Sequence, residues 1–296
     1  MAAVAGSLGV LIALALRKSE VRTTSEAWPV NFAHRGASER APENTIEAFR
    51  LAVEARAGGL ELDVHMTRDG EVVVIHDATV DRTTDGSGTV AGMTLGELRG
   101  LDAGYRFSPD GGRTHPYRGR GVRIPTLAEV CEEFPTTCLN IDIKEPQPGA
   151  EKAILQVIRE AGAQERSLVV SQNNAVVRRF RKVSGGRIPT GASRLETATF
   201  YILGRLRLER LLRPAYEALQ VPTEHRGIAL VTPRFVEAAH SRGARVDVWT
   251  INDPGEMRRL LDLGADVIMT DRPEALAGVL EGVGANSGRA APHPGL

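Results

Sequence analysis

Residues 60–76 read LELDVHMTRDGEVVVIH, two apolar, β-branched runs separated by a turn. The run Leu60–Val64 and the run that ends at His76 lie too close together for a helical crossover. The Asp69-Gly70 pair between them is a strong hairpin signal. A two-residue turn centred there pairs Asp63 with His76. The stretch therefore predicts a strand with a short antiparallel partner, and it brings a carboxylate next to an imidazole.

Short β-branched runs recur along the chain and alternate with helical patterns, which is typical of βα units around a parallel sheet. Helical spacing marks Thr45–Ala57, with Asn44 expected as its N-cap. Eight runs is the number that closes a (β/α)8 TIM barrel, so we predict this α/β fold, with the run at His76 as an extra hairpin strand at the C-terminal rim. The eight runs are Val30–His34, Leu60–Val64, Leu139–Ile143, Leu168–Ser171, Arg187–Gly191, Leu219–Val221, Arg245–Ile251 and Asp266–Thr270.

The alternation predicts one barrel domain over residues 28–280, preceded by an apolar segment and linker over residues 1–27. The apolar run Met1–Leu16 is shorter than the roughly 20 residues that cross a bilayer, and it lacks the positive start of a secretory signal. A membrane anchor, a signal peptide and a loosely ordered terminus all stay open. We expect a cytoplasmic or membrane-associated protein rather than a secreted one. The Gly-, Ala- and Pro-rich residues 281–296 are expected to be a disordered tail.

Composition limits the class of protein. The 296 residues include 37 Lys and Arg against 37 Asp and Glu, so the basic excess that nucleic-acid binding needs is missing. The chain is 42% hydrophobic and 25% charged, which is typical of a globular protein. Cys131 and Cys138 have no CxxC spacing, so we expect reduced thiols, without a disulfide framework or a Cys-based zinc site. The oligomeric state stays open.

Carboxylates gather at the carboxyl ends of the predicted strands, where barrel enzymes carry their chemistry. Glu61 and Asp63 share one face of their strand, as do Asp142 and Lys144, because strand side chains alternate with a period of two. Three carboxylates at one barrel mouth repel one another unless a cation compensates their charge. Oxygen ligands favour Mg²⁺ or Ca²⁺ over Zn²⁺. The sequence therefore predicts a divalent metal site at Glu61, Asp63 and Asp142.

Four further residues at this rim fit phosphate binding and proton transfer. A guanidinium fork and an ammonium group beside a metal suit a phosphate, so Arg35 and Lys144 are predicted phosphate ligands. His34 and His76 are predicted as the general base and the general acid, because histidine is the residue type able to exchange protons near neutral pH. A histidine at a strand end is more often structural, but the gathering of these residues at one rim favours catalysis. His65, beyond the rim, is a weaker candidate for substrate contact.

A set of short motifs occurs in this chain in a fixed order. They are Ala33-His34-Arg35-Gly36, Pro42-Glu43-Asn44-Thr45, Glu61-Leu62-Asp63-Val64, Thr67-x-Asp69-Gly70, His76-Asp77, Arg82-Thr83-Thr84, Ile124-Pro125-Thr126-Leu127, Asn140-Ile141-Asp142-Ile143-Lys144, Trp249-Thr250-Ile251-Asn252 and Thr270-Asp271-Arg272-Pro273. In this order they resemble the glycerophosphodiester phosphodiesterase family over roughly residues 30–275. That family has a (β/α)8 barrel and splits glycerophosphodiesters into an alcohol and glycerol 3-phosphate with a divalent cation.

The resemblance implies a role for each matching residue. It implies an acid–base pair (His34, His76), phosphate or substrate ligands (Arg35, Lys144, Trp249), metal ligands (Glu61, Asp63, Asp142) and residues that hold these in place (Glu43, Asn140). The third metal ligand is commonly Glu in the family and is Asp142 here, so the preferred metal stays open. Glu145 is a weaker ligand candidate, because strand alternation turns it away from the mouth. The nucleophile also stays open: water, or the substrate's own hydroxyl with a cyclic phosphate formed first.

The substrate class depends on a second region. Leu195–Tyr216 is expected to form a helix with Tyr201, Gly204, Leu208, Leu211 and Leu212 on one face and four arginines elsewhere. Such a helix either lies on an anionic membrane surface or packs on the barrel as ordinary scaffold. The motifs Asp102-Ala103-Gly104-Tyr105 and Ile124–Leu127 also resemble lysophospholipase D members of the family, which release lysophosphatidic acid. Small glycerophosphodiesters and lysolipids are thus both possible substrates, and a catalytically inactive binding barrel is the remote alternative.

Overall fold

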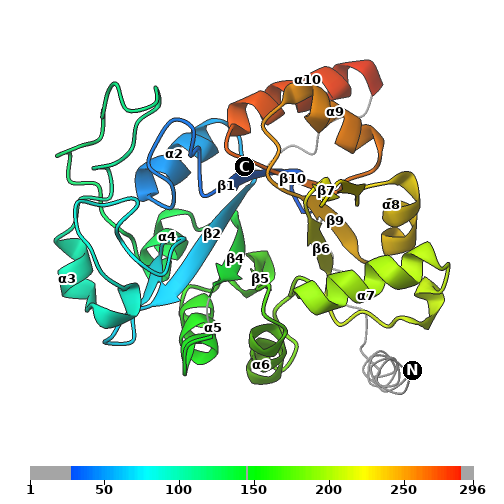
Figure 1. Ribbon diagram of the computed structural model, residues 1–296, viewed down its shortest axis with the longest axis horizontal. Helices are drawn as coiled ribbons and strands as arrows, with labels where there is room; N and C mark the ends of the chain where they lie inside the picture. Colours follow the sequence, from blue (N-terminus) through cyan, green and yellow to red (C-terminus); the bar gives the residue numbers. More distant parts are fainter. Residues whose placement is uncertain (1–27, 145, 288–296) are drawn as a thin grey trace.

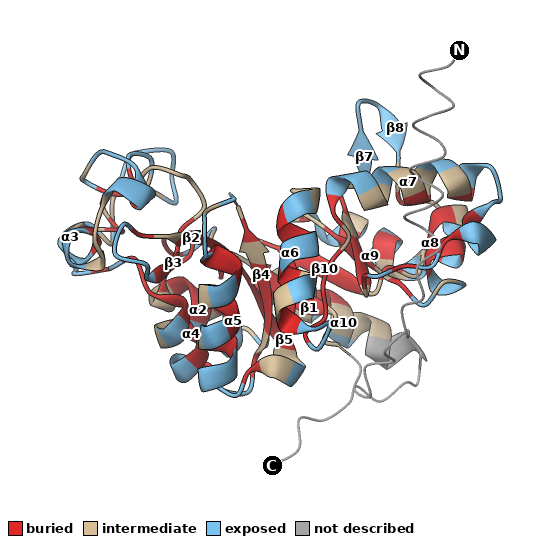
Figure 2. Ribbon diagram, turned by 90° about the horizontal axis from the view of Figure 1, so that it is seen from below, coloured by how far each residue is buried: buried red, intermediate tan, exposed pale blue. Residues whose placement is uncertain are grey.

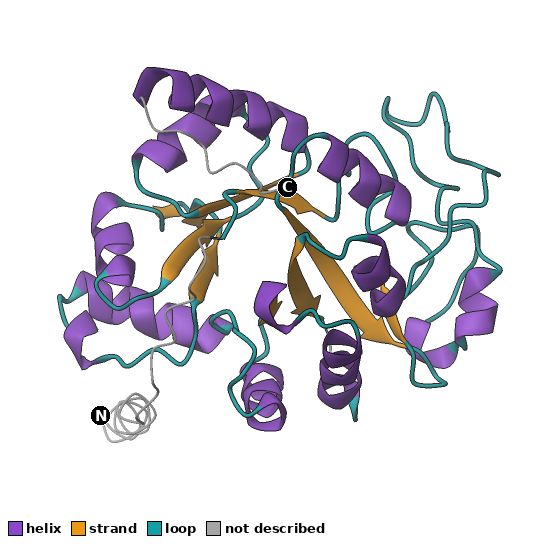
Figure 3. Ribbon diagram, turned by 180° about the vertical axis from the view of Figure 1, so that it is seen from behind, coloured by secondary structure: helices purple, strands orange, loops and turns teal. Residues whose placement is uncertain are grey.

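The computed structural model describes residues 28–144 and 146–287, with side chains up to residue 283. Its core is a curled parallel sheet surrounded by helices (Figure 1 and Figure 3). Neighbouring strands follow the order β5-β4-β2-β1-β10-β9-β6. These strands are β1 (Asn31–His34), β2 (Gly59–Met66), β4 (Cys138–Ile143), β5 (Ser167–Val170), β6 (Ala218–Val221), β9 (Arg245–Val248) and β10 (Val267–Thr270). The predicted apolar segment over residues 1–27 and the weaker ligand candidate at position 145 lie outside the described residues.

Residues 190 and 191 close the ring between β5 and β6. Thr190 forms a parallel bridge with Val169 of β5, and Gly191 forms one with Ala218 of β6. The predicted strand over residues 187–191 is therefore present only as two bridges. Pro189 has no N–H to donate, and only its carbonyl pairs, accepting from the Val169 N–H at 3.0 Å. The closed ring confirms the predicted (β/α)8 barrel.

Helices cover the outside of the ring, and their apolar faces pack against the outward side chains of the strands (Figure 2). They are α2 (Ile46–Glu54), α4 (Leu127–Glu133), α5 (Ala150–Glu160), α6 (Asn174–Ser184), α7 (Arg194–Arg205), α8 (Pro233–His240), α9 (Pro254–Asp262) and α10 (Pro273–Ser287). The shorter elements are β3 (Val72–Val74), η1 (Val90–Gly92), α3 (Leu95–Arg99), η2 (Gln164–Arg166), η3 (Glu209–Leu211), β7 (Glu224–His225) and β8 (Ile228–Ala229). In the described residues, no helix is both long and apolar enough to cross a membrane.

Helix α10 corrects the predicted start of a disordered tail at residue 281, because it continues through Ser287. Its buried Leu276 and Val279 pack on the core formed with β9 and β10, and Leu280 and Val283 extend that apolar stripe. Helical spacing of apolar residues thus outweighs the glycine content there. The remainder of the predicted tail, residues 288–296, lies outside the described part of the chain.

The hairpin after β2 forms at the C-terminal rim, as predicted, but with a different register. β3 pairs antiparallel with the end of β2, with Val64 opposite Val74. The Thr67 N–H donates to the Glu71 carbonyl at 2.9 Å, so the loop holds three residues and ends at Gly70, whose φ is +90°. The predicted pairing of Asp63 with His76 assumed a two-residue turn and is wrong by one position.

Helix α7 is shorter than the helix predicted over Leu195–Tyr216. The Leu208 N–H donates to the Leu203 carbonyl at 2.8 Å, and the Arg207 N–H donates to the Gly204 carbonyl. Arg207 has a left-handed φ of 59°. This pair of hydrogen bonds around a left-handed residue is a Schellman motif, which ends a helix. The following residues turn toward the start of β6, so the predicted single apolar face does not exist.

Apolar side chains fill the barrel below its carboxyl rim. Phe32, Val267 and Met269 form one inner cluster, and the Trp28 ring stacks on Phe32 with 5.9 Å between centroids. A Cβ on Gly59 would lie 2.2 Å from the Phe32 ring, so only glycine fits there. The filled interior leaves the carboxyl rim as the surface where polar chemistry is possible.

Leu62→Ala is expected to lower the free energy of unfolding by about 2–5 kcal/mol, because the fully buried Leu62 side chain lies between β2 and the covering helices. Urea unfolding followed by circular dichroism measures this change. Val53→Ala on α2, where the side chain is 38% exposed, is the matched control and should stay within about 0.5 kcal/mol of the parent. A loss at Leu62 as small as the control's would contradict the assigned packing.

Candidate active site

Strand register gathers the acidic residues at one point of the rim. β1 and β2 pair with His34 opposite Glu61, and β2 and β4 pair with Asp63 opposite Asp142. One carboxylate oxygen from each of Glu61, Asp63 and Asp142 lies within 4.8 Å of the others. The predicted metal ligands therefore converge, as side-chain alternation on two neighbouring parallel strands requires.

Two cations and an amide partly compensate the buried Asp63. Lys144 Nζ lies 2.6 Å from both Asp63 Oδ1 and Asp142 Oδ2, and Arg35 Nε lies 3.1 Å from Asp63 Oδ2. Asn44 Nδ2 donates to Asp63 Oδ2 at 2.7 Å. Burial alone would raise the pKa of Asp63, but Lys144 and Arg35 outweigh burial and lower the pKa. Asp63 is thus ionised at neutral pH.

The other two carboxylates are compensated less completely than Asp63. Burial, together with the charge of Asp63, raises the pKa of Glu61 to about 8. Burial also raises the pKa of Asp142, although Lys144 opposes the shift. Asp63 Oδ1 is buried and accepts no hydrogen bond of normal geometry, even with Lys144 Nζ close by. With all three carboxylates ionised, the cluster would therefore carry more negative charge than Lys144 and Arg35 balance, and Asp63 Oδ1 has lone pairs that no donor satisfies.

A divalent cation fits this donor set. Glu61, Asp63 and Asp142 supply three hard oxygen ligands from rigid strands, the arrangement that Mg²⁺ and Ca²⁺ prefer. A cation there would offset the repulsion that raises the pKa of Glu61. The ligand set predicted from the sequence is thus consistent with the geometry.

His34, the last residue of β1, is held by a carboxylate. Its Nδ1 lies 2.7 Å from Asp271 Oδ1, just after β10. Ser38 and Asn252 also donate to Asp271, and hydrogen bonding by His34 and these residues lowers the pKa of Asp271 despite its burial. Burial lowers the pKa of His34, but Asp271 and the charge of Glu61 outweigh burial and raise it. Because an ionised carboxylate only accepts, Nδ1 carries the proton and Nε2 remains for substrate.

His76 is held in the same way from the other side. Its Nδ1 lies 2.6 Å from Asp77 Oδ1. Arg82 Nε donates to Asp77 Oδ2 at 2.7 Å, and the other nitrogens of Arg82 donate to both oxygens of Glu43. Hydrogen bonds from Arg82 and His76 lower the pKa of Asp77 to about 2. Glu43 also accepts from Arg35 at 3.0 Å, so one chain of contacts joins His76 to the carboxylate cluster.

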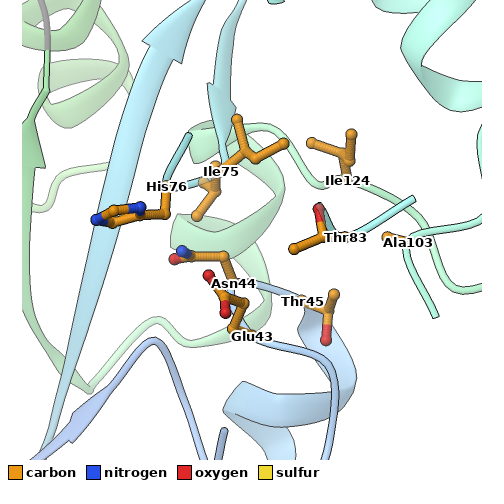
Figure 4. A pocket seen from close by; sticks show the side chains of 9 residues that line it. Glu43, Asn44, Thr45, Ile75, His76, Thr83, Ala103 and Ile124 are labelled. Atoms are coloured by element: carbon orange, nitrogen blue, oxygen red, sulfur yellow. The ribbon is translucent and has the colours of Figure 1, made fainter. Parts of the chain in front are cut away.

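A cavity of about 10 Å³ lies behind His76 (Figure 4). Figure 4 shows Glu43 and Asn44 below the imidazole, Ile75 beside it and Ile124 farther away. This volume is about that of one water-sized probe, so no phosphodiester fits there. The cavity belongs to the packing behind the site, and substrate must approach from the open mouth.

Comparison with known proteins identifies the family of this chain. Residues 34–275 match the model of the glycerophosphoryl diester phosphodiesterase family. The chain belongs to this family. A glycerophosphodiester phosphodiesterase of Caldanaerobacter subterraneus is 38% identical over 251 residues, covering 82% of this chain and 94% of the relative. Membership confirms the predicted family and the predicted enzyme class, a phosphoric diester hydrolase.

Two further family members bear on the substrate. A solved structure of an Oleispira antarctica phosphodiesterase in complex with the product sn-glycerol-3-phosphate has a TM-score of 0.69 and 28% identity, and the match covers 86% of this chain and 97% of that one. A lysophospholipase D of Mus musculus is 28% identical over 271 residues, covering 83% of this chain and 84% of the relative.

Four residues hold the histidines of the site in place but were not predicted as site residues from the sequence. Asp77, Arg82, Asn252 and Asp271 lie inside the ordered motifs, which are the one signal that could have marked them. Asn44 was predicted as the N-cap of α2, and this is wrong. Thr45 caps that helix by accepting from the Ala48 N–H, while Asn44 takes a left-handed φ of 58° and binds Asp63.

Other predicted residues lie apart from the cluster. Asn140 exchanges hydrogen bonds with Gln220 inside the barrel, and none of its described hydrogen bonds reaches a metal-ligand candidate. His65 is buried with Nε2 3.0 Å from the His76 carbonyl, so it fixes the backbone of His76 instead of facing substrate. Trp249 is half-buried just after β9 and packs on the inner cluster.

Asp77→Asn is expected to lower the free energy of unfolding at pH 7 by about 1 kcal/mol, a value reduced for solvent screening of this partly exposed group. The folded pKa of Asp77 lies below its unfolded value of about 3.9. Its stabilisation is therefore complete above pH 4 and is lost as pH falls toward about 2. Urea unfolding at pH 7, 4 and 3 measures the difference between parent and variant.

The exposed Asp262→Asn on α9 is the control for this measurement. Its difference from the parent should be small and constant over the same pH range. A difference at Asp77 that does not shrink below pH 4 would show that the Arg82 and His76 contacts do not stabilise its charged form.

Proposed function

We propose that this family member hydrolyses glycerophosphodiesters to an alcohol and sn-glycerol 3-phosphate, with His34 and His76 as the acid–base pair. The observation that carries the proposal is the presence of two histidine–aspartate pairs beside one three-carboxylate cluster. His34 lies opposite Glu61 in the register of β1 and β2, and the Ile75 N–H, directly before His76, donates to the Asp63 carbonyl, so the two imidazoles reach the cluster from different elements. A phosphodiester needs one proton removed and one delivered at such a centre.

The aspartates prepare both imidazoles for proton transfer. Asp271 and Asp77 both have lowered pKa values, so each accepts a hydrogen bond from Nδ1–H of its histidine. This fixes the tautomer and leaves each Nε2 to exchange a proton with the substrate. One histidine takes a proton from the nucleophile and the other gives one to the leaving alcohol. The nucleophile is water or the neighbouring glycerol hydroxyl.

The cations at the rim stabilise the charge that develops on the phosphoryl oxygens. The side chains of Arg35 and Lys144 are 18% and 22% exposed, so both are accessible from the mouth. Glu43 holds Arg35 in place through a 3.0 Å contact. A divalent cation bound by Glu61, Asp63 and Asp142 would supply Lewis-acid neutralisation of the phosphate. We further propose that Trp249, at the same rim, contacts the glycerol moiety.

Alanine substitution of either catalytic histidine, His34→Ala or His76→Ala, is expected to lower kcat at least about a hundredfold, the lower range for acid–base catalysis. Steady-state hydrolysis of glycerophosphocholine, with circular dichroism to verify folding, measures the loss. His225→Ala, an exposed residue of β7, is the matched control and should keep parental turnover. Near-parental turnover in either rim variant would remove that histidine from the mechanism, and an inactive parent would support the binding-barrel alternative.

A second candidate function is lysophospholipase D activity at a membrane surface. The observation that favours it is the similarity to the Mus musculus lysophospholipase D over most of both chains. Lysophosphatidylcholine carries the same phosphocholine diester as glycerophosphocholine, so the same rim residues would act on both. The two functions differ in whether an acyl chain is accommodated.

Choline release from glycerophosphocholine and from lysophosphatidylcholine should separate the two functions. We expect release to need Mg²⁺ or Ca²⁺ and to stop with EDTA, because the three carboxylates are the proposed metal ligands. Release from the glycerol diester alone would establish a small-molecule substrate, and preference for the lysolipid would establish lysophospholipase D. Full activity in EDTA, with Asp142→Asn equally active, would overturn the metal assignment.

A further inference from the structure

Large apolar side chains that face solvent are concentrated in one short segment. Among the described residues, seven such side chains are at least about one third exposed, and five of the seven fall between residues 195 and 211. The five are Leu195 (46%), Ile202 (57%), Leu206 (61%), Leu208 (42%) and Leu211 (56%). Single exposed leucines are common on protein surfaces, but five large exposed apolar side chains within 17 residues are typical of an interaction surface.

These residues face outward because the opposite face of α7 packs against α8. Phe200 and Gly204 are buried, and the Phe200 ring packs edge-on against Phe235 of α8 with 5.6 Å between centroids. Leu195, Ile202 and Leu206 follow the spacing i, i+7 and i+11, which places them together on another face of the helix. α7 follows residues 190–191 at the carboxyl end of the ring, and Figure 2 shows it at the end from which the β7–β8 hairpin projects.

The charges around this apolar stripe are almost entirely basic. Five exposed arginines belong to the segment, namely Arg194, Arg205, Arg207, Arg210 and Arg213. Its two acids are already ion-paired: Glu196 with Arg181 at 2.6 Å, and the buried Glu209 with Arg234. The side chains that reach solvent therefore combine apolar area with positive charge.

A groove beside the stripe has the same character. It measures about 720 Å³ and lies between the α7–η3 segment and α8. Its charged lining residues are Arg207, Arg210, Arg234 and Arg242, against Glu209 and Glu237. Glu209 is already bound to Arg234, so the groove keeps an excess of positive charge at its open side. Anionic headgroups complement this lining.

We propose that residues 194–213 form a docking surface for an anionic lipid bilayer. Leu195, Ile202 and the leucines after α7 enter the interfacial region, while the arginines contact anionic headgroups. A two-fold dimer through this surface is disfavoured, because it would place the five exposed arginines of one copy against those of the other, and residues 194–213 contain no exposed acid to pair with them. The inference does not rest on the lysolipid proposal, since vesicle binding and turnover are separate measurements.

The test uses the full chain with a fluorophore whose emission reports polarity. The label is attached at Ile202→Cys or, as the control on α2, at Val53→Cys, and the unsubstituted chain corrects for Cys131 and Cys138. Vesicles of phosphatidylcholine alone are compared with vesicles containing about a third phosphatidylglycerol. We expect a blue shift only at position 202, only with the anionic vesicles, and reversed by salt.

Two pairs of substitutions test the contributions of charge and apolar area. Arg207→Ala with Arg210→Ala should weaken vesicle binding roughly 25-fold, and Ile202→Ser with Leu206→Ser at least about tenfold. Arg178→Ala on α6 and Val53→Ser on α2 are the matched controls and should bind as the parent does.

Three results would overturn the proposal. The first is a chain that sediments with vesicles while the label at position 202 stays in water, which would assign binding to residues outside this surface. The second is a blue shift without vesicles that grows with protein concentration, which would make a second copy the occupant. The third is unchanged vesicle binding in both pairs of substitutions.

Discussion

Parallel pairing of β2 with β4 sets Asp63 directly opposite Asp142, and Glu61 lies on the same face of β2 two residues earlier. Oxygens of the three carboxylates lie within 4.8 Å of one another. At an effective dielectric constant of about 20, two full charges at that distance repel by about 3 kcal/mol. The barrel fixes the strands, so the side chains cannot relieve this repulsion by moving apart. The positions of the charged side chains at the rim depend on how this negative charge is compensated.

Part of the compensation comes from the chain itself. Lys144 and Arg35 contact Asp63 from opposite neighbours in the ring, since Lys144 follows β4 and Arg35 follows β1. Arg35 is in turn tied to Glu43, and Glu43 to Arg82, which also holds Asp77 beneath His76. One path of ion pairs and hydrogen bonds thus runs from the acidic cluster to an imidazole. A change in charge at the cluster therefore polarises the hydrogen bonds along this path.

The same rim carries a second, unrelated feature. The carboxylates of the cluster come from strands whose opposite faces are buried under helices, and their positions are fixed for that reason. α7 also starts at this rim, but its outer face has apolar and basic side chains that no described element covers. None of the described contacts of the three carboxylates involves a residue of 194–213, so the α7 surface and the cluster are held by different sets of residues.

The amino-acid sequence determined the barrel and most of the site, because alternation within strands depends only on local spacing. Glu61 with Asp63, and Asp142 with Lys144, had to share faces once those runs were strands. Local pattern could not decide features that depend on distant contacts. The loop length at Gly70 shifted the hairpin register by one residue, and packing against Asp63 made Asn44 a site residue instead of a helix cap.

Tertiary structure alone decided which residue binds His34 and where the helix predicted over residues 195–216 ends. Asp271 reaches His34 across 237 residues of sequence, because β10 and β1 are neighbours in the ring. Asn140 turned to Gln220 on the far side of the barrel, a contact that no spacing encodes. The helix predicted through Tyr216 ended at Arg205 because the chain had to return to β6. The spacing of residues within a strand specifies the face on which a side chain lies. The order of strands around the closed barrel specifies which distant residues that side chain contacts.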